Sequence, residues 1–429
     1  MKSNFICGTL EGFYGRPWRL DQRLQLFEWM HEWDGMNTYM YAPKDDLYHR
    51  SKWRELYPDK ELSVLKNLIQ SCHKKELDFI YAIAPGLDIM YSDENDWNFL
   101  VKKVNQLREI GCKQFAILFD DIPSKLSDND QNSFSSFACA HAHITNRLFK
   151  HLSGLSLLFC PTVYCGQMAD YDVKGNAYLN ELGELLHEEI GIFWTGPKIV
   201  SEEITVESIK ELQQVIKRKP IIWDNLHAND YDIRQISLGP YSGRSLELKN
   251  KVAGILSNPN CQFWANYNPL RTLSMYIIES ESWNPRQAYF DSSEEWMQYF
   301  GNDELTVDEI QLLGDCFYTQ GQKGELGIKL VESVECFMKN NPSEWGSHLQ
   351  NFIKLEANLN SLCKKLLAVT NRDLLYDFYL TIWELKEETE YVSKWVEWKQ
   401  SGKGEFQSPE IVPRRKGILY EFQDIIHSD

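Results

Sequence analysis

The chain has 429 residues, of which 43% are hydrophobic and 25% are charged, and its formal net charge at pH 7 is −17. This length and composition predict a globular protein with a large core and two domains. The negative charge argues against a general binder of nucleic acid or of anionic membranes, because the phosphates of both attract Lys and Arg. No apolar run approaches the roughly 20 residues that a membrane-spanning helix needs.

The ten cysteines are scattered along the chain, and none belongs to a CxxC pair or has the spacing of a zinc finger. We therefore expect free thiols in a reducing compartment. Residues 1–3 lead directly into the first apolar run, so no signal peptide is expected. The histidines form no obvious metal cluster, and we expect neither a metal nor another cofactor.

Short apolar runs with strand-like composition recur along the first two thirds of the chain. They are residues 5–9, 37–42, 79–84, 115–119, 157–161, 192–195, 220–223 and 261–265. Amphipathic stretches with helical spacing lie between them, such as Val206, Ile209, Leu212 and Ile216 before the seventh run. This alternation predicts an α/β fold, a (β/α)8 TIM-like barrel. A doubly wound open sheet is the alternative, but the turn at Glu11–Gly15 lacks the GxGxxG pattern.

The pattern changes after residue 285, where strand-like runs stop. Apolar residues then recur three and four positions apart, from Phe352 to Val369 and again from Leu375 to Val396. Such stripes are typical of a helix bundle. We therefore predict a barrel domain at residues 1–287 and an all-α helical bundle domain at residues 288–429.

The fourth run, Phe115–Phe119, ends on the adjacent aspartates Asp120 and Asp121. Five apolar residues in a row predict a strand buried on both faces. Neighbouring side chains of a strand point to opposite faces, so two neighbours can serve one site only where the strand ends. Barrel enzymes hold their catalytic groups at the carboxyl ends of their strands. The alternative is that the aspartates cap a helix or a turn.

Polar, aromatic, Gly and Pro residues follow the other runs as well. They include Glu11–Trp18, Ala42–Asp46, Pro85–Asp88, Thr162–Gly166, Trp194–Pro197 and Trp223–Asp232, with Asn258–Asn260 before the eighth run and Asn266–Tyr267 after it. Individually, each could be turn chemistry. Together they predict a pocket of carboxylates, amides and flat aromatic rings at one rim of the barrel, which suits a carbohydrate.

Six segments carry a family resemblance: EGFYGRPW at 11–18, YAPKDD at 41–46, FDD at 119–121, CPTVYCG at 160–166, WTGPK at 194–198 and WDNLHANDYD at 223–232. In order and spacing they resemble glycoside hydrolase family 84, the family of the protein O-GlcNAcases, and are most similar to its animal nucleocytoplasmic type. The resemblance extends to the helical part around Leu374–Trp398. It does not cover the acetyltransferase-like domain and the long insertion of the long animal forms.

The resemblance implies removal of β-linked N-acetylglucosamine from Ser and Thr of proteins, in the cytoplasm and nucleus. It also implies substrate-assisted catalysis, an exception to the usual two-carboxylate scheme, in which the substrate's acetamido oxygen attacks and forms an oxazoline. Asp120 would orient the acetamido N–H, and Asp121 would protonate the leaving oxygen. An ionised Asp120 would favour the protonated form of its neighbour, since like charges so close oppose joint ionisation.

The resemblance assigns the remaining site residues as follows. Tyr164 would bond the acetamido oxygen, Asn225 would support the acetamido group, Trp223 would form the wall of the acetyl pocket, and Gly12, Lys44, Asp230 and Asn258 would hold the sugar hydroxyls. Ordinary structural roles are the alternative, with Lys44 as a surface charge and Trp223 as core. We assign structural roles to Tyr14 and Asp232, and expect Arg16–Trp18 to fix the rim.

The resemblance also implies that the helical bundle forms a homodimer and reaches over the partner's active site. Trp398 would face the partner's cleft there, whereas Trp395 is expected in the core. Met168 and Tyr231 would be the barrel's own peptide-facing residues.

Two other functions are possible alternatives. One is an endo-acting hyaluronidase. The other is a catalytically inactive glycan-binding scaffold, which would be recognised by the loss of Asp120 or Asp121.

Overall fold

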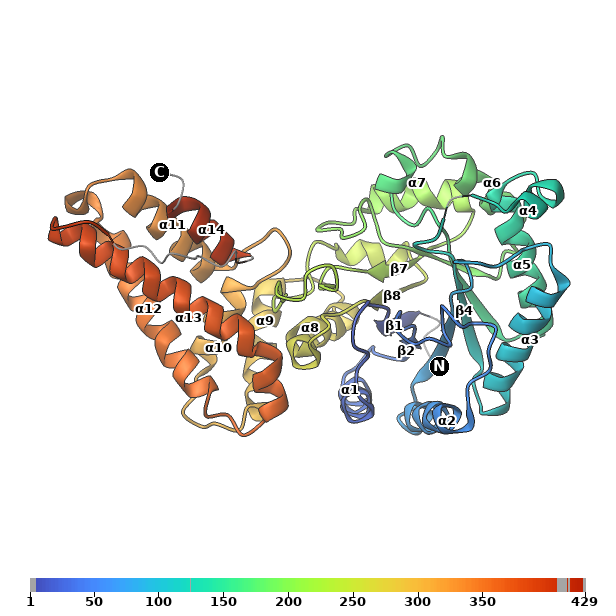
Figure 1. The fold of residues 1–429 in the computed structure, drawn as a ribbon, viewed down its shortest axis with the longest axis horizontal. Helices are drawn as coiled ribbons and strands as arrows, with labels where there is room; N and C mark the ends of the chain where they lie inside the picture. The colour runs from blue at the N-terminus through green and yellow to red at the C-terminus, as the bar shows by residue number, and fades with distance from the viewer. Residues whose placement is uncertain (1–4, 124, 407–414, 416, 427–429) are drawn as a thin grey trace. The chain divides into compact units, whose positions relative to one another are not determined.

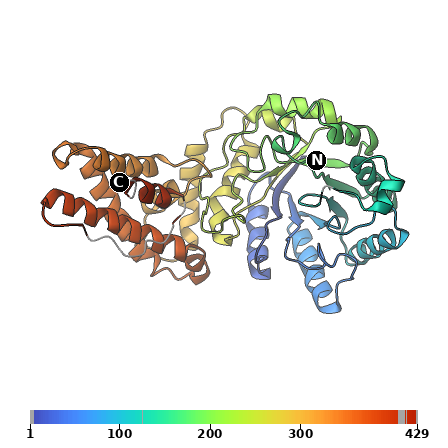
Figure 2. The same cartoon turned by 45° about the horizontal axis from the view of Figure 1, so that its top comes forward.

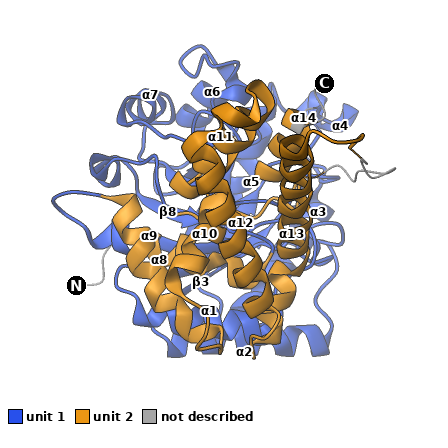
Figure 3. Cartoon of the chain, turned by 90° about the vertical axis from the view of Figure 1, so that its left-hand side faces the viewer, with its two compact units in different colours: residues 1–230, 241–261, 273–283 blue, residues 231–240, 262–272, 284–429 orange. Residues whose placement is uncertain are grey.

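The computed structural model describes residues 5–123, 125–406, 415 and 417–426 (Figure 1). Its contacts divide the chain into two units (Figure 3). Unit 1 consists of residues 1–230, 241–261 and 273–283, and unit 2 of residues 231–240, 262–272 and 284–429. The division into two domains between residues 287 and 288 stays a prediction.

Unit 1 contains a closed barrel of eight parallel strands in chain order, which confirms the predicted fold class. The strands are β1 (Ile6–Glu11), β2 (Thr38–Tyr41), β3 (Asp78–Ile83), β4 (Gln114–Leu118), β5 (Ser156–Cys160), β6 (Gly191–Trp194), β7 (Ile221–Asp224) and β8 (Gly254–Ser257). The first and last strands pair in parallel, with Ile6 opposite Gly254 and Thr9 opposite Ser257, and this pairing closes the ring. Figure 2 shows the helices around the strands.

Seven of the predicted strands are confirmed with shifts of one or two residues at their ends, but the eighth is wrong. β8 is Gly254–Ser257, and the predicted segment at 261–265 instead overlaps a 3-10 helix, η3 (Phe263–Asn266). A Cβ at Gly254 would lie 2.4 Å from the Ile6 carbonyl oxygen, so this position requires glycine for close approach of β1. A four-residue strand that begins with glycine gives little strand signal in the sequence. As a result, Asn258–Asn260 follow the strand and do not precede it.

The helices that alternate with the strands bury one face each. They are α1 (Leu20–Glu32), α2 (Asp59–Lys74), α3 (Glu94–Glu109), α4 (Asp128–Ser133), α5 (Phe137–Leu152), α6 (Ala177–Leu185), α7 (Val206–Ile216) and α8 (Tyr267–Ile278), with the 3-10 turns η1 (Gln167–Ala169) and η2 (Leu246–Asn250). Side-chain caps begin several of them: Ser136 accepts from the Cys139 amide and Thr205 from the Ser208 amide.

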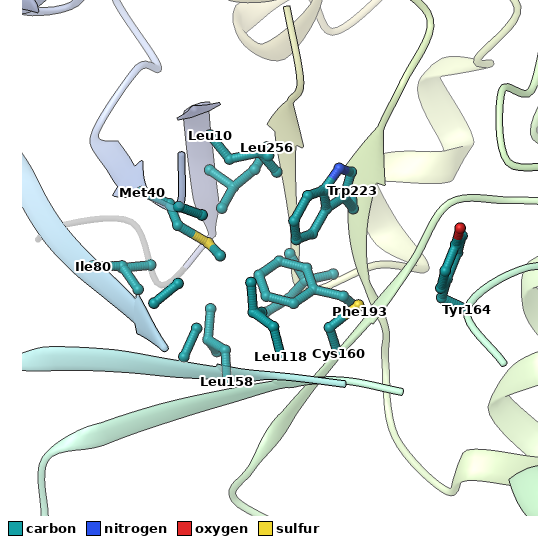
Figure 4. Packing of buried hydrophobic residues seen from close by; sticks show 14 of the residues in the cluster. Leu10, Met40, Ile80, Leu118, Leu158, Cys160, Tyr164, Phe193, Trp223 and Leu256 are labelled. Atoms are coloured by element: carbon teal, nitrogen blue, oxygen red, sulfur yellow. The ribbon is translucent and has the colours of Figure 1, made fainter. Parts of the chain in front are cut away.

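Inward-facing side chains of alternate strand positions fill the barrel (Figure 4). Leu10, Met40, Ile80, Leu118, Leu158, Phe193 and Leu256 belong to this cluster, and all are buried. At the carboxyl ends of the strands the cluster ends on Trp223, whose ring meets Phe193 edge-on at 5.5 Å. The barrel is therefore a packed core, and the space for a ligand lies beyond the strand ends.

Unit 2 is helical. Besides η3 and the first half of α8, its elements are α9 (Pro285–Trp296), η4 (Met297–Tyr299), α10 (Val307–Cys316), α11 (Glu325–Lys339), η5 (Pro342–Glu344), α12 (Gly346–Leu366), α13 (Arg372–Ser401) and α14 (Ile418–Ile426). The two predicted stripes lie on the buried faces of α12 and α13. Of the helices described, none combines the length and apolarity needed to cross a bilayer.

Candidate active site

The closed barrel brings the ends of its strands together at one rim, and the predicted sugar-site residues lie there. Gly12 follows β1, Lys44 follows β2, Asp120 and Asp121 follow β4, Tyr164 follows β5, Asn225 and Asp230 follow β7, and Asn258 follows β8. Because these segments are up to 246 residues apart in the chain, only closure of the barrel makes them neighbours.

Asp120 is a buried carboxylate paired with a buried cation. Its Oδ2 accepts a hydrogen bond from Lys44 Nζ, and only 8% of Asp120 and 7% of Lys44 are exposed. Burial has the largest single effect and opposes the charge of Asp120. The Lys44 ammonium, with smaller help from a backbone hydrogen bond and the Arg50 charge, still holds the pKa of Asp120 below its ordinary value. The other carboxylate oxygen, Oδ1, is buried and has no hydrogen-bond partner among the described residues. Asp120 is therefore an ionised acceptor with one oxygen available for a donor.

Lys44 is thus neither a surface charge nor simply a hydroxyl ligand. Burial disfavours its ammonium form, yet the Asp120 carboxylate raises the pKa of Lys44 above its ordinary value. The Nζ atom also lies 5.6 Å from the ring centre of Trp223 and 6.0 Å from that of Tyr14. These aromatic rings favour a cation at this position.

Asp121 has different surroundings, although it is the next residue. Its side chain is exposed, and its backbone adopts the left-handed conformation, with φ at 49°. Tyr164 donates its hydroxyl proton to Oδ1 at 3.0 Å, and Tyr14 donates to Oδ2 at 3.0 Å. The sequence analysis missed the contact of Tyr14, since a Tyr in a Gly-containing turn has no signal that marks it as a partner of an Asp. The geometry supports neither aspartate as a helix cap.

Tyr164 is buried, which keeps its phenol in the neutral, proton-donating form. Burial, together with the neighbouring Asp121 carboxylate, raises the pKa of Tyr164 well above its ordinary value. It therefore remains a hydrogen-bond donor throughout the pH range of most enzymes.

A chain of side-chain amides links the ends of four strand units. The Gly12 amide donates to Asn258 Oδ1 at 3.3 Å, Asn258 Nδ2 donates to Asn225 Oδ1 at 2.9 Å, and Asn225 Nδ2 donates to the Ile199 carbonyl at 2.8 Å. Asn225 and Asn258 are both buried. The fixed amides would present polar groups to sugar hydroxyls without further ordering. Asp230 completes the rim and accepts from the Tyr14 amide at 2.9 Å.

Gly12 allows Trp223 to lie against the backbone of the first loop. A Cβ at Gly12 would lie 2.5 Å from the indole Cζ2 atom of Trp223 and 2.5 Å from Leu10 Cδ1. Glycine is therefore required here for close packing, and its main-chain conformation is not the reason. The preceding residue, Glu11, is fully buried and accepts from Arg23 Nε at 2.8 Å and from the Trp18 amide at 3.0 Å, which holds this loop in place.

A buried polar network supports the strand end that carries the aspartates. Thr162 Oγ1 donates to the Phe119 carbonyl at 2.8 Å, and the Phe119 ring stacks on His141 at 4.2 Å. Burial lowers the pKa of His141 to about 3, so its imidazole is neutral. Its two ring nitrogens contact the hydroxyls of Tyr91 and Tyr178 at 2.9 and 2.8 Å. Sequence reasoning did not find this network, because its members lie in five separate segments.

The predicted peptide-facing residues are divided between the units. Met168, in η1 of unit 1, is half-buried against the barrel core. Tyr231 and Trp398 belong to unit 2, where Tyr231 is exposed and Trp398 Nε1 donates to the Gly404 carbonyl at 3.1 Å. Trp395 is buried, as predicted. A shared cleft for these residues stays a prediction.

Among the described residues, no three His, Cys, Asp or Glu side chains are grouped so that they could hold a metal ion. The functional groups of the site are instead three carboxylates, one ammonium, two phenols and a row of amides. Such a set can exchange protons and hold a polyhydroxyl ligand.

A family model described as beta-N-acetylglucosaminidase matches residues 7–309. The chain belongs to this glycoside hydrolase family. The Protein O-GlcNAcases of Mus musculus and Rattus norvegicus are each 49% identical to it over 349 residues, which is 81% of this chain and 36% of theirs. The chain thus spans about a third of the length of those relatives. A solved O-GlcNAc hydrolase mutant from Thermobaculum terrenum superposes with a TM-score of 0.81 at 29% identity, over 92% of this chain and 84% of that one.

We predict that Lys44→Met destabilises the fold more at neutral than at acidic pH. In the wild type, the pKa of Asp120 is lower in the folded than in the unfolded state, so its ionised form stabilises the fold. This stability is fully present above the pKa of Asp120 in the unfolded chain, and it is lost as the pH falls through the pKa in the folded state. Without the ammonium, the cost of burying the Asp120 charge would be largely uncompensated. A carboxylate that stabilises the wild type at neutral pH would then destabilise the variant there. The expected loss is about 3–5 kcal/mol near neutral pH and less at acidic pH, as measured by urea unfolding.

The control is the double variant Lys44→Met/Asp120→Asn, which removes both charges. It should recover most of the lost stability and its difference from the wild type should vary little with pH. An equal loss for Lys44→Met at both pH values would show that packing, and not the charge of Asp120, explains the effect.

Proposed function

We propose that this chain is a retaining exo-β-N-acetylglucosaminidase that removes O-linked N-acetylglucosamine from Ser and Thr of proteins. The main support is the buried Asp120 carboxylate, with Oδ2 on Lys44 and Oδ1 without a partner among the described residues. A buried oxygen of this kind requires a donor, and a substrate amide N–H would supply one. The names of the mouse, rat and Thermobaculum terrenum relatives agree with this substrate.

In the first step of the proposed reaction, the acetamido oxygen of the substrate attacks its own anomeric carbon. The bond from that carbon to the Ser or Thr oxygen breaks, and Asp121 gives its proton to the departing oxygen. Asp120 accepts a hydrogen bond from the acetamido N–H and stabilises the positive charge that develops on the oxazoline. The lowered pKa of Asp120 supports this role, because the group stays ionised.

In the second step, water attacks the anomeric carbon of the oxazoline, and Asp121 takes the water proton. The ring opens, the acetamido group is restored, and two inversions give net retention. With substrate bound, Tyr164 would donate its one hydroxyl proton to the acetamido oxygen in place of Asp121. Trp223 would cover the acetyl methyl group, and Asn225 would support the acetamido group. Gly12, Lys44, Asp230 and Asn258 would hold the hydroxyls of a terminal sugar.

The first test is release of a chromophore from an aryl N-acetyl-β-glucosaminide. If the acetamido oxygen is the nucleophile, the corresponding aryl β-glucoside should react on the order of 10²-fold more slowly or worse. Comparable turnover of the two substrates would contradict substrate assistance. Absence of any release would favour a glycan-binding scaffold, and cleavage of hyaluronan would favour the endo-acting alternative. A chelator should leave the rate unchanged.

The two aspartates should respond differently to the leaving group. Asp121→Asn should abolish cleavage of a glycopeptide, whose alkoxide leaving group needs a proton, but spare much of the first step on an aryl glycoside with an acidic phenol. Asp120→Asn should lower the rate on the order of 10²-fold or more with every leaving group, since it removes the charge that stabilises the oxazoline. The measurement is kcat/KM across aryl glycosides of graded phenol acidity. The reverse pattern would exchange the two assignments.

We also propose a homodimer formed through the helical unit. Tyr376, Tyr379, Leu380 and Trp383 are all at least 45% exposed and lie on one face of α13. Beside them, α12 and α13 line a mostly apolar hollow of about 400 Å³. An exposed apolar face of this kind is typical of a protein–protein interface, and a second copy of the chain would cover it.

The dimer proposal predicts a mass of two chains by sedimentation at micromolar concentration. Trp398→Ala should lower activity on glycoproteins more than on aryl glycosides, because Trp398 is proposed to contact the polypeptide of a substrate bound to the partner. Trp395→Ala, at a buried position, serves as the comparison and should lower stability instead. A monomer would contradict the proposal.

We propose a location in the cytoplasm and nucleus. The support is that all ten cysteines are free thiols and seven of them are buried, which suits a reducing compartment.

A further inference from the structure

Arg50 contacts both the main chain and, through a tyrosine, the side chain of Asp121. This half-buried arginine lies in the segment after β2. Its Nη2 donates to the Asp121 carbonyl oxygen at 3.0 Å, and its Nη1 donates to the Tyr14 hydroxyl at 2.6 Å. Tyr14 in turn donates to Asp121 Oδ2 at 3.0 Å. One planar guanidinium thus fixes the orientation of Asp121 at two points.

Asp121 needs such support because its backbone is strained. Its φ of 49° is in the left-handed region, which residues with a Cβ adopt rarely. Strained conformations of this kind persist only where surrounding contacts hold them, and they are concentrated at functional sites. The hydrogen bond from Arg50 holds the peptide group that follows this torsion, so its loss would let the carboxyl group turn away from Tyr14 and Tyr164.

Arg50 does not act as a simple counterion. Within the described part of the chain, it makes no direct ion pair with the Asp121 carboxylate, and the hydrogen bond to the carboxylate comes from Tyr14. The guanidinium carbon lies 5.2 Å from the ring centre of Tyr14, close enough to polarise this phenol. A polarised phenol is a stronger donor and would better stabilise Asp121 in the carboxylate form that follows proton transfer.

We infer that Arg50 is a positioning residue for the proton donor of the reaction, acting on Asp121 through its carbonyl oxygen and through Tyr14. The inference rests on the proposed function, in which Asp121 protonates the leaving oxygen. Lys44 and Arg50, which both lie in the segment after β2, then have separate roles. Lys44 holds the buried Asp120, and Arg50 holds the exposed Asp121.

The test compares Arg50→Gln, Arg50→Lys and Tyr14→Phe, with Lys52→Gln as the matched control. Lys52 is two residues away, and its ammonium lies 3.7 Å from the Glu55 carboxylate on the surface. We measure kcat/KM on aryl N-acetyl-β-glucosaminides with phenols of graded acidity. Arg50→Gln should lose about 10-fold to 10²-fold with the most basic phenol and little with the most acidic one. Lys52→Gln should match the wild type with all substrates.

Rescue and coupling separate positioning from a general loss of structure. Arg50→Lys keeps the charge but cannot make both contacts, so it should recover only part of the loss. The double variant Arg50→Gln/Tyr14→Phe should lose less than the product of the single losses, because the two residues act on one group. In an Asp121→Asn background, Arg50→Gln should have no further effect. Urea unfolding would verify that each variant is folded.

An equal loss for Arg50→Gln with every leaving group, or a full further loss in the Asp121→Asn background, would overturn the inference. If the wild type hydrolyses the substrates and Asp121→Asn is sensitive to the leaving group, but Arg50→Gln matches Lys52→Gln, the inference alone fails. If the wild type releases no phenol from any substrate, the proposed function fails and the inference with it.

Discussion

The ion pair between Lys44 and Asp120 is the interaction on which the site depends. A carboxylate that is nearly excluded from water must be paired or lose its charge, and the Lys44 ammonium keeps Asp120 ionised. Since Lys44 follows β2 and Asp120 follows β4, the pair also joins two loops at the barrel rim. Because Lys44 contacts only one carboxylate oxygen, the other remains available to a ligand. In the proposed reaction, the same contact would therefore serve both folding and recognition.

Asp120 and Asp121 are adjacent in the sequence, and both lie just after the end of β4. A strand would send neighbouring side chains to opposite faces, but β4 has already ended at Leu118. The left-handed backbone of Asp121 accompanies an exposed second carboxyl group, whereas that of Asp120 is buried. There two phenols, Tyr14 and Tyr164, donate to it. Two chemically identical groups thus differ in burial and in partners, as the separate tasks in the proposed reaction require.

The rest of the rim is rigid for reasons of packing. Trp223 covers the barrel core and lies so close to Gly12 that no side chain fits between them. The amide of Gly12 begins the hydrogen-bonded row through Asn258 and Asn225, so the packing of one glycine and one tryptophan sets the position of the polar groups beside them. Preorganised groups of this kind would bind the proposed sugar without the cost of ordering loops.

The sequence alone determined the barrel class, seven of the eight strands, the stripes of α12 and α13, and the aspartate pair, because burial period and strand-end chemistry are local properties of the chain. The tertiary structure decided what depends on ring closure. β8 is recognisable only from its pairing with β1, since Gly254 and three further residues carry little strand signal. Likewise, Tyr14 contacts Asp121 from 107 residues away in the chain, and Arg50 contacts it from 71 residues away. No local pattern encodes such contacts, because they follow from how the barrel brings the strand ends together.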